Sequence, residues 1–234
     1  MTGQDTTKRE KATTTDRSRM AMLWYRAVQV TATTLVSSIS GLRVSGRENL
    51  PEQGGALLVS NHLSHLDVFI LGIPLQRPLN YVARSTLFLP ILGTLIRSVG
   101  GFPIQRDGMG AQGLKETLRR LKHGGIVALF PEGTRSRDGE LGELKSGISV
   151  LASRARVAVV PAAIAGTFES WPRSRPFPMP YPIRIHYGPP IYPSQLEGLD
   201  PEAVTELIRV RILECQEEAR AGLQRDLRRD GSEN

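Results

Sequence analysis

Residues 56–73 have the sequence ALLVSNHLSHLDVFILGI, in which two apolar runs enclose a short polar segment. The run 56–60 predicts a buried strand, and the apolar residues of 66–73 predict a helix. The polar residues 61–67 then follow the carboxyl end of a strand, where open α/β sheets place their binding sites. This stretch therefore predicts one strand–helix unit of an α/β fold, with a candidate site at its turn.

The same alternation continues on both sides of this stretch. Apolar runs predict strands at 81–83, 126–130, 157–164 and 183–187, and helical spacing predicts helices at 86–99 and 110–123. We therefore expect the fold class α/β, with a largely parallel sheet flanked by helices. The expected organisation is a disordered leader at 1–19, an amphipathic helix at 20–40, the α/β domain at 41–192 and a helical extension at 193–234, whose charged helix over 201–229 is expected to be solvated.

Charge narrows the choice of partner. The 234 residues carry 30 Lys and Arg against 23 Asp and Glu, and residues 20–200 hold the whole net charge of +7. Most of these cations are arginines, which suit bidentate contact with phosphate or carboxylate. Nucleic acid, an anionic membrane surface and phosphorylated small molecules are the candidate partners. The single cysteine, Cys215, excludes an intramolecular disulfide and a cysteine metal cluster, which fits a reducing compartment.

Hydropathy and missing motifs exclude further classes of protein. The chain has no run of 18 apolar residues, and its first apolar stretch begins at Met20 and is interrupted by Arg26, so any membrane attachment is expected to be interfacial. Neither G-x-S-x-G nor G-x-x-x-x-G-K-[ST] occurs, so an α/β-hydrolase serine and a P-loop lack their defining residues. The sequence GMGAQG at 108–113 fits G-x-G-x-x-G, but Arg106 and Asp107 precede it where a dinucleotide fold has an apolar strand.

The polar segment 61–67 has residues suited to acid–base chemistry. Ser64 and Asp67 have the spacing of a capping box, so we expect Ser64 to cap the following helix and Asp67 to lie in its first turn. His62 can then donate one ring N–H to Asp67 and accept a hydroxyl proton on its other ring nitrogen. With no serine or cysteine nucleophile evident, the expected chemistry is direct attack by a substrate hydroxyl on an activated acyl group. A structural His–Asp pair, or a zinc site of His62, His65 and Asp67, is the alternative at this stage.

A second polar segment, FPEGTRS at 130–136, follows the predicted strand 126–130 and should open onto the same sheet edge. Gly133 permits close approach of the backbone to a ligand, and Thr134, Arg135 and Ser136 supply donors for an oxyanion or a phosphate. Two weaker signals accompany it: GGFPIQR at 100–106 ends on Arg106 beside a glycine-rich turn, and Pro161 interrupts a predicted strand.

Four segments, in this order along the chain, resemble the four blocks of the glycerolipid acyltransferases, specifically the bacterial 1-acylglycerol-3-phosphate acyltransferases. They are the HX4D pattern of His62 and Asp67, the segment ending in Arg106, the segment 130–136 and Val160–Pro161. The resemblance extends over about Leu42–Tyr187, so the domain at 41–192 is expected to be an acyltransferase domain. It implies transfer of a fatty acyl group from acyl-CoA or acyl carrier protein to the sn-2 hydroxyl of 1-acylglycerol 3-phosphate, giving phosphatidic acid in phospholipid biosynthesis. No metal and no other cofactor is implied.

The resemblance also implies roles for individual residues. His62 matches the general base of the family and Asp67 the carboxylate that orients it. The positions linked in the family with substrate binding are Arg84, Arg106, Glu132, Gly133, Thr134, Arg135, Lys145 and Pro161, of which Pro161 is associated with the acyl donor or local shape. The family commonly has lysine where Arg84 stands, and Pro103 and Gln105 depart from the usual second block.

The implied partners are lysophosphatidic acid, an acyl thioester, acyl carrier protein as an alternative donor, and a membrane surface, with no nucleic acid. The implied location is the cytoplasmic face of the cell membrane, as a peripheral or monotopic protein. The apolar segment 86–96 is either a buried helix bent at Pro90 or a segment that contacts lipid or an acyl chain, and the resemblance favours the latter. Three alternatives stay open: another acceptor such as lyso-ornithine lipid, a non-enzymatic lipid-binding protein, and a basic nucleic-acid-binding protein.

Overall fold

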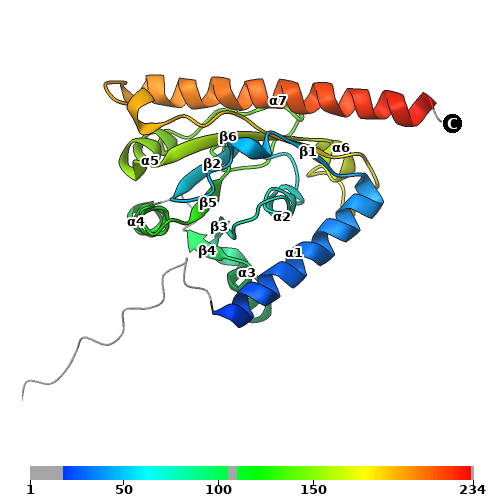
Figure 1. Cartoon of the computed structure of the whole chain (residues 1–234), viewed down its shortest axis with the longest axis horizontal. Coiled ribbons are helices and arrows are strands. Elements are labelled where there is room, and N and C mark those ends of the chain that lie inside the picture. The colour runs from blue at the N-terminus through cyan, green and yellow to red at the C-terminus, as the bar shows by residue number, and fades with distance from the viewer. Residues whose placement is uncertain (1–17, 105–109, 233–234) are drawn as a thin grey trace, which may run out of the picture.

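The structure, a computed structural model, describes residues 18–104 and 110–232 (Figure 1). The helices are α1 (Arg19–Ser40), α2 (Asp67–Ile70), α3 (Pro90–Ser98), α4 (Gly110–Lys122), α5 (Gly147–Ala155), α6 (Thr167–Ser170) and α7 (Pro201–Ser232), with short 3-10 turns at Arg47–Asn49, Ser85–Leu87 and Pro193–Gln195. The strands are β1 (Arg43–Ser45), β2 (Ala56–Ser60), β3 (Leu79–Arg84), β4 (Gly101–Ile104), β5 (Ile126–Leu129), β6 (Ala158–Ala165) and β7 (Arg184–Tyr187).

Within the described residues, seven strands form one sheet in the order β1-β7-β6-β2-β5-β3-β4. The five strands from β6 to β4 are parallel to one another, while β7 runs antiparallel to β6 and β1 runs parallel to β7. The expected α/β fold with a largely parallel sheet is therefore confirmed. Strand β2 lies between β6 and β5, so the segment that follows it emerges near the middle of the sheet.

Strand β2 is buried along its whole length because helices cover both faces of the sheet. Leu57 and Val59 pack into one core with residues of α4, α5 and α7, whereas Ala56 and Leu58 pack into a second core on the side of α1 and α2. Alternate side chains of a strand point to opposite faces, so an all-apolar strand is what a two-sided layer requires. Figure 1 shows α7 along one side of the sheet and α1 and α2 on the other.

Several predicted elements differ from those observed. The helix expected at 66–73 is shortened to α2, and the helix expected at 86–99 is not bent at Pro90 but begins there, with Pro90 in its first turn, where a missing N–H costs no hydrogen bond. Sequence patterns missed β1, β4 and α5. Strand β4 is an edge strand, and Pro103 is tolerated there because one side of such a strand is not hydrogen-bonded.

The long helix α7 is not simply a solvated element, as the sequence suggested. Val204, Ile208 and Ile212 recur every four residues and are fully buried in the core formed with α4 and α5. Near the end of the helix, Asp226 accepts hydrogen bonds from Arg43 of β1 and Arg184 of β7. One face of α7 is therefore part of the core and includes Asp226, while the other described charged residues of the helix are exposed or half-buried.

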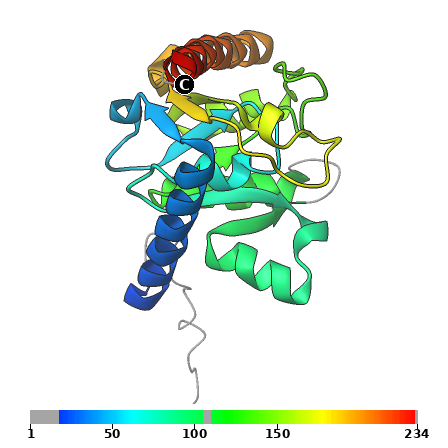
Figure 2. The same ribbon diagram turned by 90° about the vertical axis from the view of Figure 1, so that its right-hand side faces the viewer.

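Helix α1 is held to the body by polar contacts. The Gln29 side-chain amide donates to the carbonyls of Gly72, Ile73 and Leu75 in the turn after α2, and the Trp24 indole donates to Ser98 Oγ of α3 at 3.1 Å. Figure 2 shows α1 lying along the outside of the molecule, with its first turns beside α3. In the described part of the chain, no helix combines the length and apolar character needed to cross a bilayer.

Candidate active site

Three adjacent strands deliver the candidate site to one edge of the sheet. Strands β6, β2 and β5 are parallel neighbours, so their carboxyl ends lie side by side. Segment 61–67 follows β2, segment 130–136 follows β5, and residues 166–171 follow β6. The first two segments were predicted to meet at this edge; the third was not identified from the sequence.

His62 and Asp67 form the hydrogen-bonded pair that the sequence predicted. His62 Nδ1 lies 2.9 Å from Asp67 Oδ2, and because an ionised carboxylate only accepts, Nδ1 carries the hydrogen. The Asp67 side chain is fully buried, whereas that of His62 is 17% exposed and stacks on the Phe130 ring with centroids 4.2 Å apart. His62 Nε2 has no hydrogen bond to any described residue, which leaves it able to accept a proton from a ligand.

The turn that carries the pair makes only half of the expected capping box. Asp67 Oδ2 accepts the backbone N–H groups of Leu63 and Ser64 at 2.6 and 2.7 Å, as the acidic member of such a box should. Ser64 Oγ, however, does not reach the backbone of Asp67. It accepts the N–H of Leu66 and donates to the carbonyl of Trp171 at 2.8 Å. Ser64 thus connects this turn to the segment after β6 instead of capping α2.

Segment 130–136 holds the backbone of His62 from both sides. The backbone N–H of His62 donates to Glu132 Oε1 at 2.8 Å, and the carbonyl of His62 accepts the N–H of Ser136 at 2.7 Å. The other carboxylate oxygen, Glu132 Oε2, accepts the N–H of Gly142 at 2.9 Å. Both oxygens of this buried carboxylate therefore bind backbone groups of the protein. Through these contacts Glu132 fixes the position of the His62 backbone.

Burial raises the pKa of Glu132, and the two backbone N–H donors only partly offset this effect. His65, by contrast, lies at the rim of the site. Its ring contacts that of Trp171 at 5.2 Å between centroids, and its pKa is lowered by burial and then by electrostatic interaction with Arg135 and His62. His65 is thus adjacent to the His62–Asp67 pair but has no hydrogen bond with it.

The other predicted residues of segment 130–136 form the outer part of the site. Gly133 has a φ of +68°, which favours glycine, and the Lys145 methylenes lie 3.7 Å from where a Cβ of residue 133 would stand. The Lys145 N–H donates to the carbonyl of Pro131, so the two segments are joined. Thr134 and Lys145 are exposed and Arg135 is half-buried. These cations give the open side of the site a positive charge.

Three predicted residues lie elsewhere or outside the description. Arg106 lies in 105–109, outside the described residues. The backbone of Arg84 is described and ends β3 opposite Ile104, but its side chain is also outside the description. Pro161 is buried within β6, opposite Val59 of β2. It precedes the turn after β6, and it makes no hydrogen bond to His62 or Asp67.

Sequence reasoning missed two residues that bind the site together. Asn61 is fully buried, and its amide both donates to the carbonyl and accepts the N–H of Ile164 in β6. Thr167, also fully buried, donates its hydroxyl to Asp67 Oδ1 at 2.7 Å. The only signal in the sequence was the position of Thr167 just after a predicted strand and directly after Gly166. Among the described residues, no group of three or more His, Cys, Asp or Glu side chains is arranged to hold a metal ion.

The chain is similar to known acyltransferases. The model of the family described as Acyltransferase matches residues 41–165. The chloroplastic 1-acyl-sn-glycerol-3-phosphate acyltransferase LPAT1 of Arabidopsis thaliana is 34% identical over 171 residues, which are 71% of this chain and 48% of that protein. The 1-acyl-sn-glycerol-3-phosphate acyltransferase of Bacillus subtilis is 28% identical over 188 residues, 78% of this chain and 92% of that protein. The chain thus spans about half the length of the plant relative and most of the bacterial one.

A solved structure has the same architecture. The crystal structure of the 1-acyl-sn-glycerophosphate acyltransferase PlsC from Thermotoga maritima matches with a TM-score of 0.73 and 24% identity, covering 86% of this chain and 83% of that chain. The family model includes β2, β5 and β6 and the segments 61–67 and 130–136, and it ends at residue 165, just before the third segment. Sequence, site geometry and these comparisons agree that the chain belongs to the acyltransferase family.

Proposed function

We propose that this protein transfers a fatty acyl group from acyl-CoA or acyl carrier protein to the sn-2 hydroxyl of 1-acylglycerol 3-phosphate, giving phosphatidic acid. The observation that carries the proposal is the His62–Asp67 pair at the open edge of the sheet, with Nε2 of His62 left to accept a proton. The names of the plant and bacterial relatives support the choice of acceptor.

The proposed reaction needs one proton acceptor and no covalent enzyme intermediate. His62 Nε2 removes the proton of the acceptor hydroxyl while the oxygen of that hydroxyl attacks the thioester carbonyl. The buried carboxylate of Asp67 stabilises the imidazolium that forms and keeps the hydrogen on Nδ1. The carbon–sulfur bond then breaks, and the leaving thiolate takes the proton back from the imidazolium. The products are the acylated acceptor and the free thiol.

Phosphate binding is assigned to the cations around the site. Arg135 and Lys145 lie in or beside the segment that contacts His62, and arginine matches phosphate through paired N–H donors. Arg84 and Arg106 remain proposed phosphate contacts from the sequence blocks. Glu132 is proposed to act indirectly, because both of its oxygens accept backbone N–H groups.

The test is release of free thiol by the purified protein in detergent. Acyl-CoA or acyl-acyl carrier protein is supplied with lysophosphatidic acid, with lyso-ornithine lipid, or without acceptor. We expect release that depends on lysophosphatidic acid and is lost in His62→Ala. His123→Ala is the matched control, since His123 is exposed at the end of α4 and binds only a backbone carbonyl of its own helix.

Release with lyso-ornithine lipid alone would preserve the chemistry but contradict the acceptor. Folded protein that releases no thiol with any donor and acceptor would contradict the enzyme and favour a lipid- or nucleic-acid-binding role. Near wild-type turnover by His62→Ala would contradict the general base.

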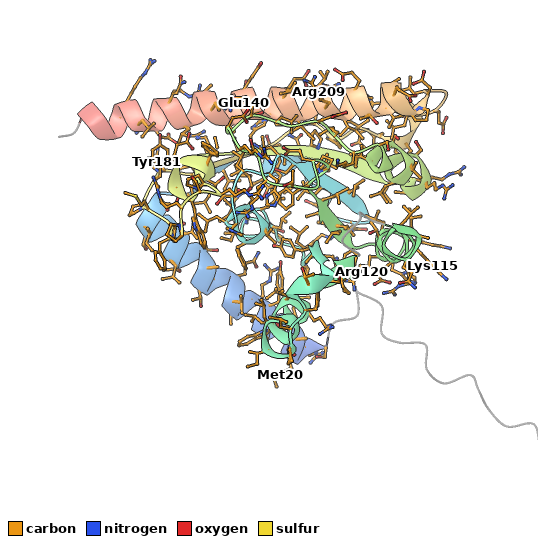
Figure 3. The ribbon with its side chains drawn as sticks, turned by 180° about the vertical axis from the view of Figure 1, so that it is seen from behind. Met20, Lys115, Arg120, Glu140, Tyr181 and Arg209 are labelled. Atoms are coloured by element: carbon orange, nitrogen blue, oxygen red, sulfur yellow. The ribbon has the colours of Figure 1, made fainter. Side chains whose placement is uncertain are left out.

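We also infer that the protein works at a membrane surface, on the cytoplasmic side where acyl-CoA and acyl carrier protein are found. The support is an exposed apolar surface shared by α1 and α3, the α1/α3 surface, made up of Met20, Leu23, Trp24, Leu89, Ile91, Leu92 and Leu95. Figure 3 shows Met20 at the end of the molecule opposite α7, where Arg209 lies. Such a patch on one end suits insertion among lipid headgroups.

Sedimentation with vesicles of phosphatidylglycerol tests this inference. Ile91 is 89% exposed, so Ile91→Glu should weaken binding without loss of folding, because it adds a charge where lipid is expected. Val210→Glu on α7 is the control at the opposite end. Equal binding by the two variants would contradict the assigned surface.

A further inference from the structure

Thr167 is a fully buried residue that binds the carboxylate of the candidate catalytic pair. Its hydroxyl donates to Asp67 Oδ1 at 2.7 Å, whereas Oδ2 accepts His62 Nδ1–H and two backbone N–H groups. Within the described residues, Thr167 therefore supplies the one hydrogen bond to Oδ1, and it comes from a part of the chain 100 residues away.

The backbone places Thr167 there because a glycine, Gly166, follows the last residue of β6. Gly166 has a φ of +91°, and a Cβ at this position would stand 2.0 Å from the carbonyl oxygen of Pro182. Only glycine fits such a turn without a shift of the neighbouring strand connection. The turn directs the chain into α6 with Thr167 as its first residue, facing the turn that carries Asp67.

Further hydrogen bonds make the segment after β6 a rigid support for that turn. Asn61 is hydrogen-bonded twice to Ile164, and Ser64 Oγ donates to the carbonyl of Trp171. Along the segment after β2, both contacts precede Asp67, whereas Ile164 and Trp171 lie on either side of Thr167. Because buried hydroxyls and amides are costly to leave unpaired, this arrangement has one favoured register.

We propose that Thr167 is a positioning residue of the reaction: its hydroxyl holds the Asp67 carboxylate in the orientation in which Oδ2 receives the His62 ring hydrogen. This inference rests on the proposed function only for its kinetic readout. Removal of the hydroxyl leaves Oδ1 buried without a hydrogen-bond donor. The carboxylate then rotates toward other donors, and no hydrogen bond from Thr167 stabilises its negative charge. The ring of His62 is then held less well, while the acceptor and donor sites are untouched.

The test compares three substitutions of decreasing donor strength with the intact chain. Thr167→Ser keeps the hydroxyl, Thr167→Cys has a weak thiol donor, and Thr167→Val keeps the shape but has no donor. The matched control is Thr117→Val, because Thr117 is equally buried, on α4, and its hydroxyl has no hydrogen-bond partner within the described residues. Each variant is assayed for thiol release, and the His62 Nδ1–H proton is followed by NMR, assigned by its loss in His62→Gln.

We expect kcat to fall in the order Ser, Cys, Val, with Thr167→Val reduced roughly 10-fold and the KM values of both substrates changed by less than about twofold. The acid limb of the pH profile should move in Thr167→Val, since the carboxylate holds the ring hydrogen differently, and the Nδ1–H signal should shift. Thr117→Val should change none of these quantities.

Three results would overturn the proposal: equal kcat for the Ser, Cys and Val variants, an unshifted Nδ1–H signal in Thr167→Cys and Thr167→Val, or a change of KM alone. The NMR signal does not depend on turnover. A shifted signal in a chain that transfers no acyl group would therefore support the positioning role while contradicting the proposed function.

Discussion

Replacement of Asp67 by Asn isolates the contribution of one buried charge to the proposed reaction. Asp67 Oδ2 accepts two backbone N–H groups besides His62 Nδ1–H, so the side-chain oxygen of Asn must take that position and its NH₂ must face Thr167. The Thr167 hydroxyl can turn to accept from it. The variant thus keeps the ring orientation and hydrogen position of His62 and removes only the negative charge.

The size of the effect follows from the distance. With Nδ1 and Oδ2 2.9 Å apart, the two charge centres are about 4 Å apart, and their attraction at an effective dielectric constant of about 20 is about 4 kcal/mol. This attraction exists only while His62 carries the proton, so its loss raises the barrier of the step. A barrier change of about 4 kcal/mol lowers kcat by about 10³-fold.

The assay is thiol release with lysophosphatidic acid and acyl-CoA, together with thermal unfolding of the same preparation. We expect kcat to fall about 10³-fold, both KM values to stay within about threefold and the midpoint of unfolding to change little. Asp67→Ala is the comparison: it leaves three N–H groups and the Thr167 hydroxyl without their acceptor, so it should also unfold at a lower temperature. A loss of kcat smaller than about 10-fold in Asp67→Asn would refute the role of the charge.

Three further predictions concern the support of the site and of the fold. Glu132→Gln turns an NH₂ toward one of the two backbone N–H donors, so we expect a loss of about 1–3 kcal/mol in unfolding free energy by urea titration, with the exposed Glu143→Gln as control; an unchanged midpoint would contradict this. Gly166→Ala should lose at least about 1–3 kcal/mol from its positive φ and its contact with Pro182, whereas Gly147→Ala, which meets nothing within 4 Å, should not be destabilised. Burial raises the pKa of Asp226, but the hydrogen bonds from its two arginines outweigh burial and lower it, so its stabilisation is present above the ordinary aspartate pKa of about 3.9 and is lost as pH falls further. The stability difference between the native chain and Asp226→Asn should accordingly be constant near neutral pH and shrink in acid; a difference that grows in acid would refute the sign.

Local patterns were sufficient for the elements nearest the site. Strand β2 was predicted with its observed bounds, because five small or apolar residues in a row fit a strand covered on both faces. The pairing of His62 with Asp67 was also predictable, since four intervening residues close a turn of fixed size. Segment 130–136 was placed correctly at the same edge because parallel strands of one sheet have their carboxyl ends on the same side.

Patterns failed where an element is short or where its environment decides its state. Residues 101–104 contain glycine and proline and form a strand only because β3 offers an edge to pair with. Helix α7 has enough charge to appear solvated, yet Val204, Ile208 and Ile212 are buried because the sheet lies beneath that face. The spacing of these apolar residues was visible in the sequence, but the sheet surface against which they pack was not.

The sequence by itself therefore determined the α/β class, the order of the blocks and the pairing of His62 with Asp67, all of which depend on neighbours along the chain. Tertiary structure alone decided that Glu132 binds the backbone of His62 and that Thr167 binds Asp67. Hydrogen bonds between segments 70 and 100 residues apart depend on strand order and register. That register is fixed by burial of apolar side chains on both faces of the whole sheet, which no short stretch of sequence contains.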